Sequence, residues 1–308
     1  MILTVTANPT IDRVYFVDGF EIGNVYRVGG ASCSAGGKGI NVARVAHIMG
    51  CETAAMGFVG GYAGAFIKDE VEKQGIKNLF TDIKGETRTN VNISDKSGKS
   101  GELLEYGPEI TIEEREEFIK DFSANVDKFN IICVSGSLPR GLTSDFYKEL
   151  VCIAKEKGKK IIVDTSGNTL KEVLSAKPYM VKPNSDEVAA LMHMEIKTDE
   201  EIKNALLYLY EEGVEVPFIS LGGEGAAAMT RDGFYKFLPP EVTVINAVGS
   251  GDCAVAGLAS GLDMGYDIID SLRLAMAAGA ANTQFEQTGI VTRELVDKFV
   301  DEVLVKKM

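Results

Sequence analysis

The chain has 308 residues, of which 45% are hydrophobic and 25% charged, and it carries a formal net charge of −13. This length and composition predict one large soluble α/β domain or two smaller ones. The acidic balance argues against nucleic acid or an anionic membrane as the main partner, because both favour basic surfaces. Five scattered cysteines without a CxxC pair fit a reducing compartment. No basic leader and no run of about 18 apolar residues occurs, so we expect a cytoplasmic protein without a membrane span.

The first third of the chain predicts an opening strand at 1–6, followed by short β segments at 13–17, 25–28 and 31–33. Apolar residues at helical spacing then predict a helix over 39–49. A strand at 54–59 leads into a second helix at 63–74. Two further strands, 89–93 and 101–105, are predicted on either side of a turn at 95–98.

From residue 110 onward, helices and strands alternate. The predicted helices are 112–124, 144–157, 185–192, 199–212, 252–264, 268–284 and 293–305. The predicted strands are 131–135, 160–164, 179–182, 216–221 and 242–245, with a hairpin around 231–233. This alternation predicts a three-layer α/β/α core with a mostly parallel central sheet. The early strands do not fit this alternation. They predict a small antiparallel β appendage, or lid, made of residues 9–34 and 85–108, with the core at 1–8, 35–84 and 109–308.

The sequence Gly249-Ser250-Gly251-Asp252 stands directly before an apolar helix. Glycines allow a sharp turn there, and the amides at a helix start attract phosphate. Asp252 could accept the proton of a hydroxyl that attacks phosphorus, which is what phosphoryl transfer requires. An ordinary N-cap explains the same residues, so this motif alone leaves both interpretations open.

A second glycine cluster, residues 36–41, contains Lys38 and Asn41 among glycines, which indicates a polar ligand site. It lacks the spacing of a Walker A motif. Residues 57–64 likewise lack the GxGxxG spacing of a dinucleotide site, so tight packing of strand on helix explains them better.

Together, the motifs at 36–43 and 248–252 resemble the two signatures of the ribokinase/PfkB carbohydrate kinases. Residues 135–139, 182–187 and 220–226 follow in the family's order, so the resemblance covers essentially the whole chain. The phosphofructokinase branch, with 1-phosphofructokinase and tagatose-6-phosphate kinase, is most similar at 84–88, 106–110, 137–142 and 286–289. The resemblance implies a ribokinase-like fold and an ATP-dependent sugar kinase.

The resemblance also implies a catalytic centre. Asp252 would be the base on a primary hydroxyl, and the amides of Gly249, Ser250, Gly251 and Asp252 would hold the transferring phosphoryl group. Asn184 and Glu187 would hold Mg²⁺ through water, although an N-capping Asn with a solvated Glu is the alternative. ATP would contact Lys182, Asn184, Ser220, Gly222, Gly223, Glu224, Gly225, Ala278 and Asn282. A K⁺ ion would lie against carbonyls of Asn246, Val248 and residues 286–289.

For the sugar, the resemblance implies hydrogen bonds to Asp12, Gly37 and Asn41. The substrate's own phosphate would meet Arg88, helped by Arg27, Lys38, Ser137 and Arg140. The alternative for each arginine is an exposed solvated charge. A cluster of this kind indicates a phosphorylated substrate. The predicted reaction therefore converts a ketohexose monophosphate (tagatose-6-phosphate, fructose-1-phosphate or fructose-6-phosphate) to the 1,6-bisphosphate.

Other functions remain open on the sequence alone. They are a kinase of an unphosphorylated sugar or nucleoside, a sugar-phosphate-binding regulator without catalysis, and an NAD-dependent oxidoreductase, which the glycine spacing disfavours. Apolar residues on the open-edged lid segments predict that two lids pair in a homodimer. In such a dimer Arg27 would reach the neighbouring subunit's phosphate.

Overall fold

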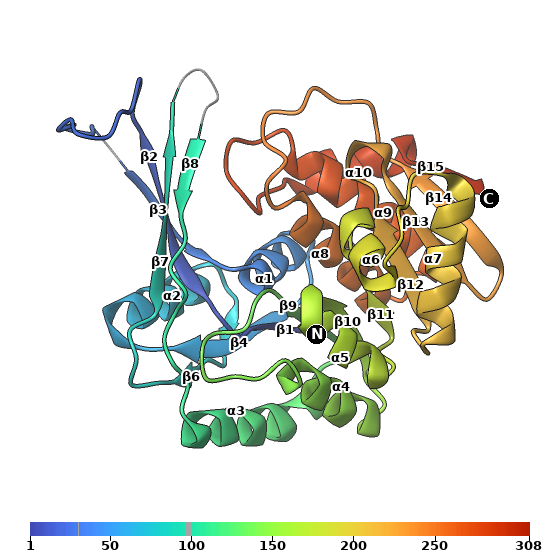
Figure 1. Ribbon diagram of the computed structural model, residues 1–308, viewed down its shortest axis with the longest axis horizontal. Helices are drawn as coiled ribbons and strands as arrows, with labels where there is room; N and C mark the ends of the chain where they lie inside the picture. Colours follow the sequence, from blue (N-terminus) through green and yellow to red (C-terminus); the bar gives the residue numbers. More distant parts are fainter. Residues whose placement is uncertain (30, 96–99) are drawn as a thin grey trace.

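The computed structural model describes residues 1–29, 31–95 and 100–308. A large sheet lies at the centre with helices packed on it, and a small sheet stands apart beside it (Figure 1). The parallel part of the large sheet contains β5 (Lys77–Asn78), β4 (Thr53–Val59), β1 (Ile2–Thr6), β9 (Ile131–Ser135), β10 (Lys160–Asp164), β11 (Met180–Val181) and β12 (Val216–Ser220), in that spatial order. β6 (Thr81–Asp82) also pairs with β4 in parallel. An antiparallel extension follows β12, formed by β13 (Ala226–Thr230), β14 (Gly233–Leu238) and β15 (Leu304–Lys307).

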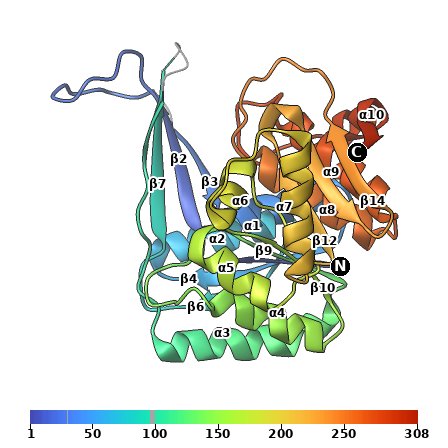
Figure 2. The ribbon, with the colours of Figure 1, turned by 45° about the vertical axis from the view of Figure 1, so that its right-hand side comes forward.

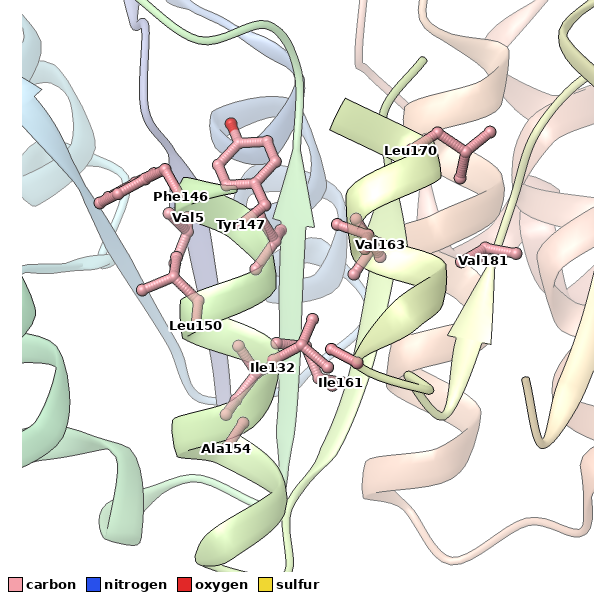
Figure 3. Packing of buried hydrophobic residues seen from close by; sticks show 14 of the residues in the cluster. Val5, Ile132, Phe146, Tyr147, Leu150, Ala154, Ile161, Val163, Leu170 and Val181 are labelled. Carbon is pink, nitrogen blue, oxygen red and sulfur yellow. The ribbon is translucent and has the colours of Figure 1, made fainter. Parts of the chain in front are cut away.

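The two faces of this sheet are covered by different helices. Alternate strand residues such as Val5 and Val163 belong to an apolar cluster with α3 (Ile112–Asn125), α4 (Phe146–Glu156), α5 (Gly167–Ser175), α6 (Ser185–Met192) and α7 (Asp199–Glu211). Figure 3 shows Val5 and Val163 packed among side chains of α4 and α5. The strand residues between them, such as Ile162, face α1 (Lys38–Ile48), α8 (Ser250–Asp263), α9 (Ile268–Asn282) and α10 (Arg293–Glu302). Burial on both faces explains the continuously apolar strands.

The small sheet has the order β3 (Ala31–Gly36), β2 (Thr10–Phe16), β7 (Arg88–Ser94) and β8 (Ser100–Leu103). β2 pairs with β3 antiparallel and with β7 in parallel, so two distant segments of the chain meet in it. The predicted antiparallel pairing is therefore wrong for β2 and β7, because these strands come from separate segments that no hairpin joins. α2 (Gly61–Lys73) packs against β2 and β3 and links this sheet to the core. In Figure 2 the small sheet stands to one side of the central sheet.

The structure confirms the predicted α/β fold with a mostly parallel central sheet and a small separate sheet. Two predicted strands are wrong: residues 25–28 and 242–245 form no strand. Val25 is 95% exposed and Val244 57% exposed, so their β-forming side chains have no sheet to pack on. α5 and the strand β15 were not predicted, and the last helix ends at Glu302 rather than 305. The predicted turn at 95–98 lies mostly outside the described residues.

A close approach between two strands leads to a prediction about stability. Gly57 of β4 stands opposite Thr6 of β1, and an added Cβ would collide with the backbone oxygen of Thr6. Gly57→Ala should therefore lower the free energy of unfolding by ~1–3 kcal/mol, as overpacking does. Thermal unfolding followed by circular dichroism would measure it. Gly101→Ala is the matched control, because a Cβ there meets open space; equal melting temperatures for the two variants would contradict the prediction.

Candidate active site

The candidate site lies where the carboxyl ends of the parallel strands meet the starts of α1 and α8. Ser135 ends β9 and Asp164 ends β10, and the two residues are register partners in the parallel sheet. The residue before each of them in its strand faces the helix layer on the opposite side of the sheet. The N-cap of α8, Gly249, has φ 84, and a Cβ there would lie 2.8 Å from the amide nitrogen of Gly289. Only glycine both adopts this positive φ easily and leaves out the colliding Cβ. The first amides of α8 have no acceptor within the helix, so positive potential collects at its start.

Asp252 lies in the first turn of α8 and is 6% exposed. Its Oδ2 accepts a hydrogen bond from Asn41 Nδ2 at 2.9 Å. Burial raises the pKa of Asp252 to about 6, and the nearby Asp164 adds to the effect. The hydrogen bond from Asn41 and the charges of Lys38 and Lys182 oppose it. A carboxylate with this pKa can take up a proton from an alcohol near neutral pH.

Asp164 holds two lysines beside this base. Its Oδ1 lies 3.5 Å from Lys38 Nζ and its Oδ2 3.4 Å from Lys182 Nζ, while the residue itself is 2% exposed. Lys182 Nζ lies 3.3 Å from the place of a Cβ on Gly251, so its charge stands over the α8 amides. The sequence prediction found both lysines and missed Asp164. The feature that could have identified Asp164 is its place at the carboxyl end of a buried parallel strand, where ligands bind in such sheets.

On the small sheet, Asp12 of β2 accepts a hydrogen bond from Asn90 Nδ2 at 3.2 Å. Burial raises the pKa of Asp12, against the opposing effects of Asn90, Arg88 and Arg44. A Cβ on Gly36 would collide with the Asp12 carboxylate, which explains a glycine at that position. The structure thus brings together the predicted sugar ligand Asp12 and the predicted phosphate ligand Arg88. Asn90 was not predicted.

Arg88 and Arg140 bind backbone carbonyls of the segment that follows β8. Arg88 Nη1 donates to the oxygen of Glu105 at 3.1 Å, and Arg140 Nη2 donates to that of Gly107 at 3.2 Å. Arg88 Nη2 donates to the oxygen of Asn8 at 2.9 Å, and its buried Nε has no partner among the described residues. Ser137 is exposed near Arg140 in the chain. These two arginines are therefore held by hydrogen bonds to the protein, although Arg140 itself is exposed.

Arg27 is placed differently. It is exposed in the loop between β2 and β3, which Figure 2 shows extending away from the central sheet. Within one chain the structure does not bring Arg27 to Asp12 or Arg88. Its predicted role depends on a second subunit.

Asn184 and Glu187 form a reciprocal capping box at the start of α6. Asn184 Oδ1 accepts from the amide of Glu187 at 2.8 Å, and Glu187 Oε2 accepts from the amide of Asn184 at 2.9 Å. The N-cap alternative therefore describes what Asn184 does here. The cap does not use the second oxygen of Glu187, and the charge of Glu187 acts on Lys38. A magnesium role for the pair stays a prediction.

The predicted nucleotide loop follows β12, next to this cap. Asn184 and Ser220 form an isolated parallel bridge, and residues Gly222–Glu224 form a short 3-10 turn. A Cβ added to Gly222 or Gly223 would meet nothing within 4 Å. The space above these glycines is open, as a loop that admits a nucleotide requires.

Two residues predicted to contact the nucleotide, Ala278 and Asn282, are both 0% exposed. Contact of their side chains with ATP would require neighbouring residues to move, and the assignment stays a prediction. Asn282 instead braces the site from within. Its Nδ2 donates to the oxygen of Val248 at 2.9 Å, and its Oδ1 accepts from the amide of Gly289 at 2.9 Å.

The predicted potassium region is built from the same loops. Asn246 Nδ2 donates to the oxygen of Glu286 at 2.9 Å, and Asn246 Oδ1 accepts from the amide of Val248 at 2.9 Å. These bonds join the segment before α8 to residues 286–289. The carbonyl of Val248 already accepts from Asn282. Binding of K⁺ here stays a prediction.

Within residues 1–29, 31–95 and 100–308, no group of three or more His, Cys, Asp or Glu side chains is arranged to hold a metal ion. In the same part of the chain no helix has the length and apolarity needed to cross a membrane.

A buried carboxylate at a helix start, two lysines and an open glycine loop on a parallel α/β sheet are the parts of a phosphotransferase. The sequence profile of the pfkB family carbohydrate kinases matches residues 3–294, and the chain belongs to this family. The predicted ATP-dependent carbohydrate kinase is thereby confirmed.

Individual proteins and solved structures that are similar to this chain are also carbohydrate kinases. Tagatose-6-phosphate kinase of Staphylococcus epidermidis is 40% identical over 308 residues, covering 99% of both proteins. Phosphofructokinase-2 from Escherichia coli, solved in complex with potassium, is 25% identical with a TM-score of 0.91 over 98% of each chain. Ribokinase from Arabidopsis thaliana shares the fold, with a TM-score of 0.78 at 21% identity over 97% of this chain and 98% of that one. The expected ribokinase-like fold is confirmed.

The buried charge of Asp252 makes a prediction about stability. Its pKa is 3.8 when unperturbed and about 6 in the folded protein, so ionisation costs the folded state up to ~3 kcal/mol. That cost is absent below pH 3.8, grows as pH rises to about 6, and is constant above it.

Asp252→Asn should therefore raise the free energy of unfolding at pH 7.5, and the gain should shrink as pH falls from about 6 towards 4. Urea unfolding at several pH values would measure it. Asp263→Asn is the control, because Asp263 pairs with the N-terminal ammonium group at 2.8 Å, and its loss should destabilise. A destabilised Asp252→Asn at pH 7.5 would contradict the assigned electrostatics.

Proposed function

We propose that this protein transfers the γ-phosphoryl group of ATP to the free primary hydroxyl of a ketohexose monophosphate, giving the 1,6-bisphosphate. The observation that carries the proposal is the position of Asp252, a buried carboxylate in the first turn of α8, next to amides that have no acceptor within the helix. The similarity to a tagatose-6-phosphate kinase and to a phosphofructokinase supports the substrate class.

The geometry supports a simple transfer. The hydroxyl of the sugar binds at Asp252, and its proton passes to the carboxylate as the oxygen attacks the γ-phosphorus. The bond from that phosphorus to the β–γ bridging oxygen breaks, and ADP leaves with its electron pair. The amides of Gly251 and Asp252, together with Lys182, face the phosphoryl oxygens, where negative charge must be stabilised. Asp12 accepts hydrogen bonds from the sugar and so fixes which hydroxyl reaches Asp252.

The substrate's phosphate would bind at Arg88 and Arg140. Both guanidinium groups already donate hydrogen bonds to backbone carbonyl oxygens of one segment, residues 105–107. A phosphate offers stronger charged acceptors than a carbonyl and suits the planar guanidinium fork. The buried, unpartnered Nε of Arg88 gives this group a donor that only a ligand or a rearrangement would satisfy.

Asn184 and Glu187 would hold Mg²⁺ through water, and the ion would supply positive charge to the nucleotide's phosphates. Oxygen donors are what Mg²⁺ prefers, and it keeps several waters. That preference fits a pair with one carboxylate oxygen outside the capping box. The potassium complex of phosphofructokinase-2 supports a K⁺ ion against Val248 and residues 286–289 in this chain.

We also propose that residues 9–34 and 85–108 act as a lid over the sugar and pair with a second lid in a homodimer. Large apolar side chains on these segments are exposed, including Phe16, Ile22, Val25 and Leu103. A second subunit would cover them and could bring its Arg27 to the site. The five free cysteines support a reducing compartment such as the cytoplasm.

The role of Asp252 is tested by Asp252→Asn. The amide keeps the shape of the carboxylate and cannot accept the hydroxyl's proton, so kcat should fall by ~10²–10⁴ while ATP still binds. A coupled assay of ADP release would measure kcat, and calorimetry would measure ATP binding. Activity near that of the wild type would end the assignment of Asp252 as base.

The substrate is tested by the same ADP assay on a panel. Fructose-1-phosphate, fructose-6-phosphate, tagatose-6-phosphate, fructose and ribose would be compared by kcat/KM. We expect turnover of at least one ketohexose phosphate with kcat/KM well above those of fructose and ribose. Turnover of the free sugars alone would instead support a kinase of the ribokinase type.

Arg88→Met tests the phosphate contact. A hydrogen bond to a charged group contributes about 1.5–3 kcal/mol, so KM for the sugar phosphate should rise by ~10-fold or more. KM for ATP should stay the same. Arg231→Met is the control, because Arg231 is exposed and pairs only loosely with Glu215 at 3.6 Å. An unchanged KM for the sugar phosphate would place its phosphate elsewhere.

A further inference from the structure

Arg44 of α1 is a partly buried cation whose guanidinium group has three acceptors. Its Nη1 donates to Oδ1 of Asn41 at 2.9 Å, and its Nη2 donates to the oxygen of Ala35 at 2.6 Å. Its Nε donates to Oε1 of Gln74 at 3.0 Å. The acceptors lie on α1 itself, at the end of β3 and after α2, so the guanidinium is fixed from three sides.

Asn41, one turn before Arg44 on the same helix, links this cation to the catalytic base. A carboxamide has a donating end and an accepting end that are nearly the same shape. Arg44 can only donate, so it selects Oδ1 and turns Nδ2 towards Asp252, where the hydrogen bond is 2.9 Å. With the amide reversed, Oδ1 would face the carboxylate and no hydrogen bond could form to the charged base.

Packing holds the amide in the same place. A Cβ on Gly289 would lie 2.7 Å from Cγ and 2.8 Å from Oδ1 of Asn41, so the backbone of Gly289 lies directly against the side chain. This packing restricts the position of the Asn41 side chain, but it does not distinguish the amide oxygen from the amide nitrogen. The choice of end falls to the polar partners. The ionised Asp252 only accepts and favours the same end, and Arg44 maintains that choice when Asp252 takes up a proton.

We propose that Arg44 is a positioning residue for phosphoryl transfer, locking the Asn41 amide in the orientation that donates to Asp252. This rests on the proposed function, in which Asp252 is the base. Arg44 itself touches neither sugar nor nucleotide in this assignment. It acts through Asn41.

The charged groups around both residues agree with this role. Asp12, Glu70, Cys253 and Asp252 act on Arg44. Asp164, Lys38 and Lys182 act on Asp252. Arg44 thus interacts electrostatically both with Asp12, the proposed sugar ligand, and with Asp252, the proposed base. Loss of its charge and loss of the orientation of Asn41 should both raise the pKa of Asp252, and the experiment must separate the two.

Four variants separate them: Arg44→Met, Arg44→Lys, Asn41→Leu and the double variant Arg44→Met/Asn41→Leu. Arg44→Met should lower kcat by ~10–10², the cost of a misplaced catalytic group, with KM for ATP unchanged. Arg44→Lys keeps the charge, but all its donors are on one nitrogen and cannot reach three acceptors that Arg44 reaches with three nitrogens, so it should lose most of the same activity. In the Asn41→Leu background, adding Arg44→Met should change kcat less than ~3-fold, because the residue through which it acts is gone.

The pH profile gives a readout that general destabilisation would not move. The acidic limb of kcat/KM should lie near the pKa of Asp252, about 6, and Arg44→Met should move it upward by about one pH unit. Arg115→Met is the control for loss of a partly buried arginine, because Arg115 pairs with Glu149 away from the site. It should leave the limb in place.

Multiplicative effects of Arg44→Met and Asn41→Leu, or an acidic limb that stays in place in Arg44→Met, would overturn the proposal. Carbon-13 NMR titration of Asp252 tests it without activity. There the pKa should rise in Arg44→Met and in Arg44→Lys, and an unchanged value would overturn it. Absence of kinase activity in the wild type would instead reject the proposed function, and the NMR result would still decide the orientation. If Arg44→Met fails to fold, Arg44→Lys carries both measurements.

Discussion

The site depends on one constraint, which is that a carboxylate must stay ionised while almost fully buried. Asp252 meets it at the start of α8, where amides without helical acceptors face outward. Asn41 donates to the carboxylate directly, and Lys38 and Lys182 stand nearby. Asp164 holds the two lysines and at the same time repels Asp252. The balance leaves a base that is charged at neutral pH and still able to take a proton.

The parallel sheet brings these groups together because all its strands end on the same side. Asp164 ends β10 and Lys182 follows the neighbouring β11, while Lys38 and Asp252 lie in the first turns of helices on one face. The late segment around Gly289 then packs on Asn41, and Asn282 ties that segment to the start of α8. Residues far apart in the chain thereby become one rigid support, which is what a catalytic group held to within an ångström requires.

The small sheet contributes the groups that would select the substrate. Asp12 and Arg88 lie on its paired strands β2 and β7. Both arginines assigned to the substrate's phosphate now bind carbonyls of residues 105–107. Phosphate would compete for the same donors. In the proposed assignment, binding of a phosphorylated sugar and the position of residues 105–107 would therefore be linked through shared hydrogen bonds.

The sequence by itself determined the alternation of helices and strands and the glycine turns, because these rest on local periodicity and residue chemistry. It pointed to Asp252 as the base only through the combination of several motifs, and that role stays a proposal. It could not show that residues 242–245 lack a neighbouring strand, since sheet pairing is decided by distant segments. It likewise placed Asn282 at the nucleotide, although tertiary packing buries it completely. Arg44 and Asp164 were ordinary charged residues in the sequence. Only the tertiary structure decided their importance, because a charge acquires a role from the partners that folding places around it.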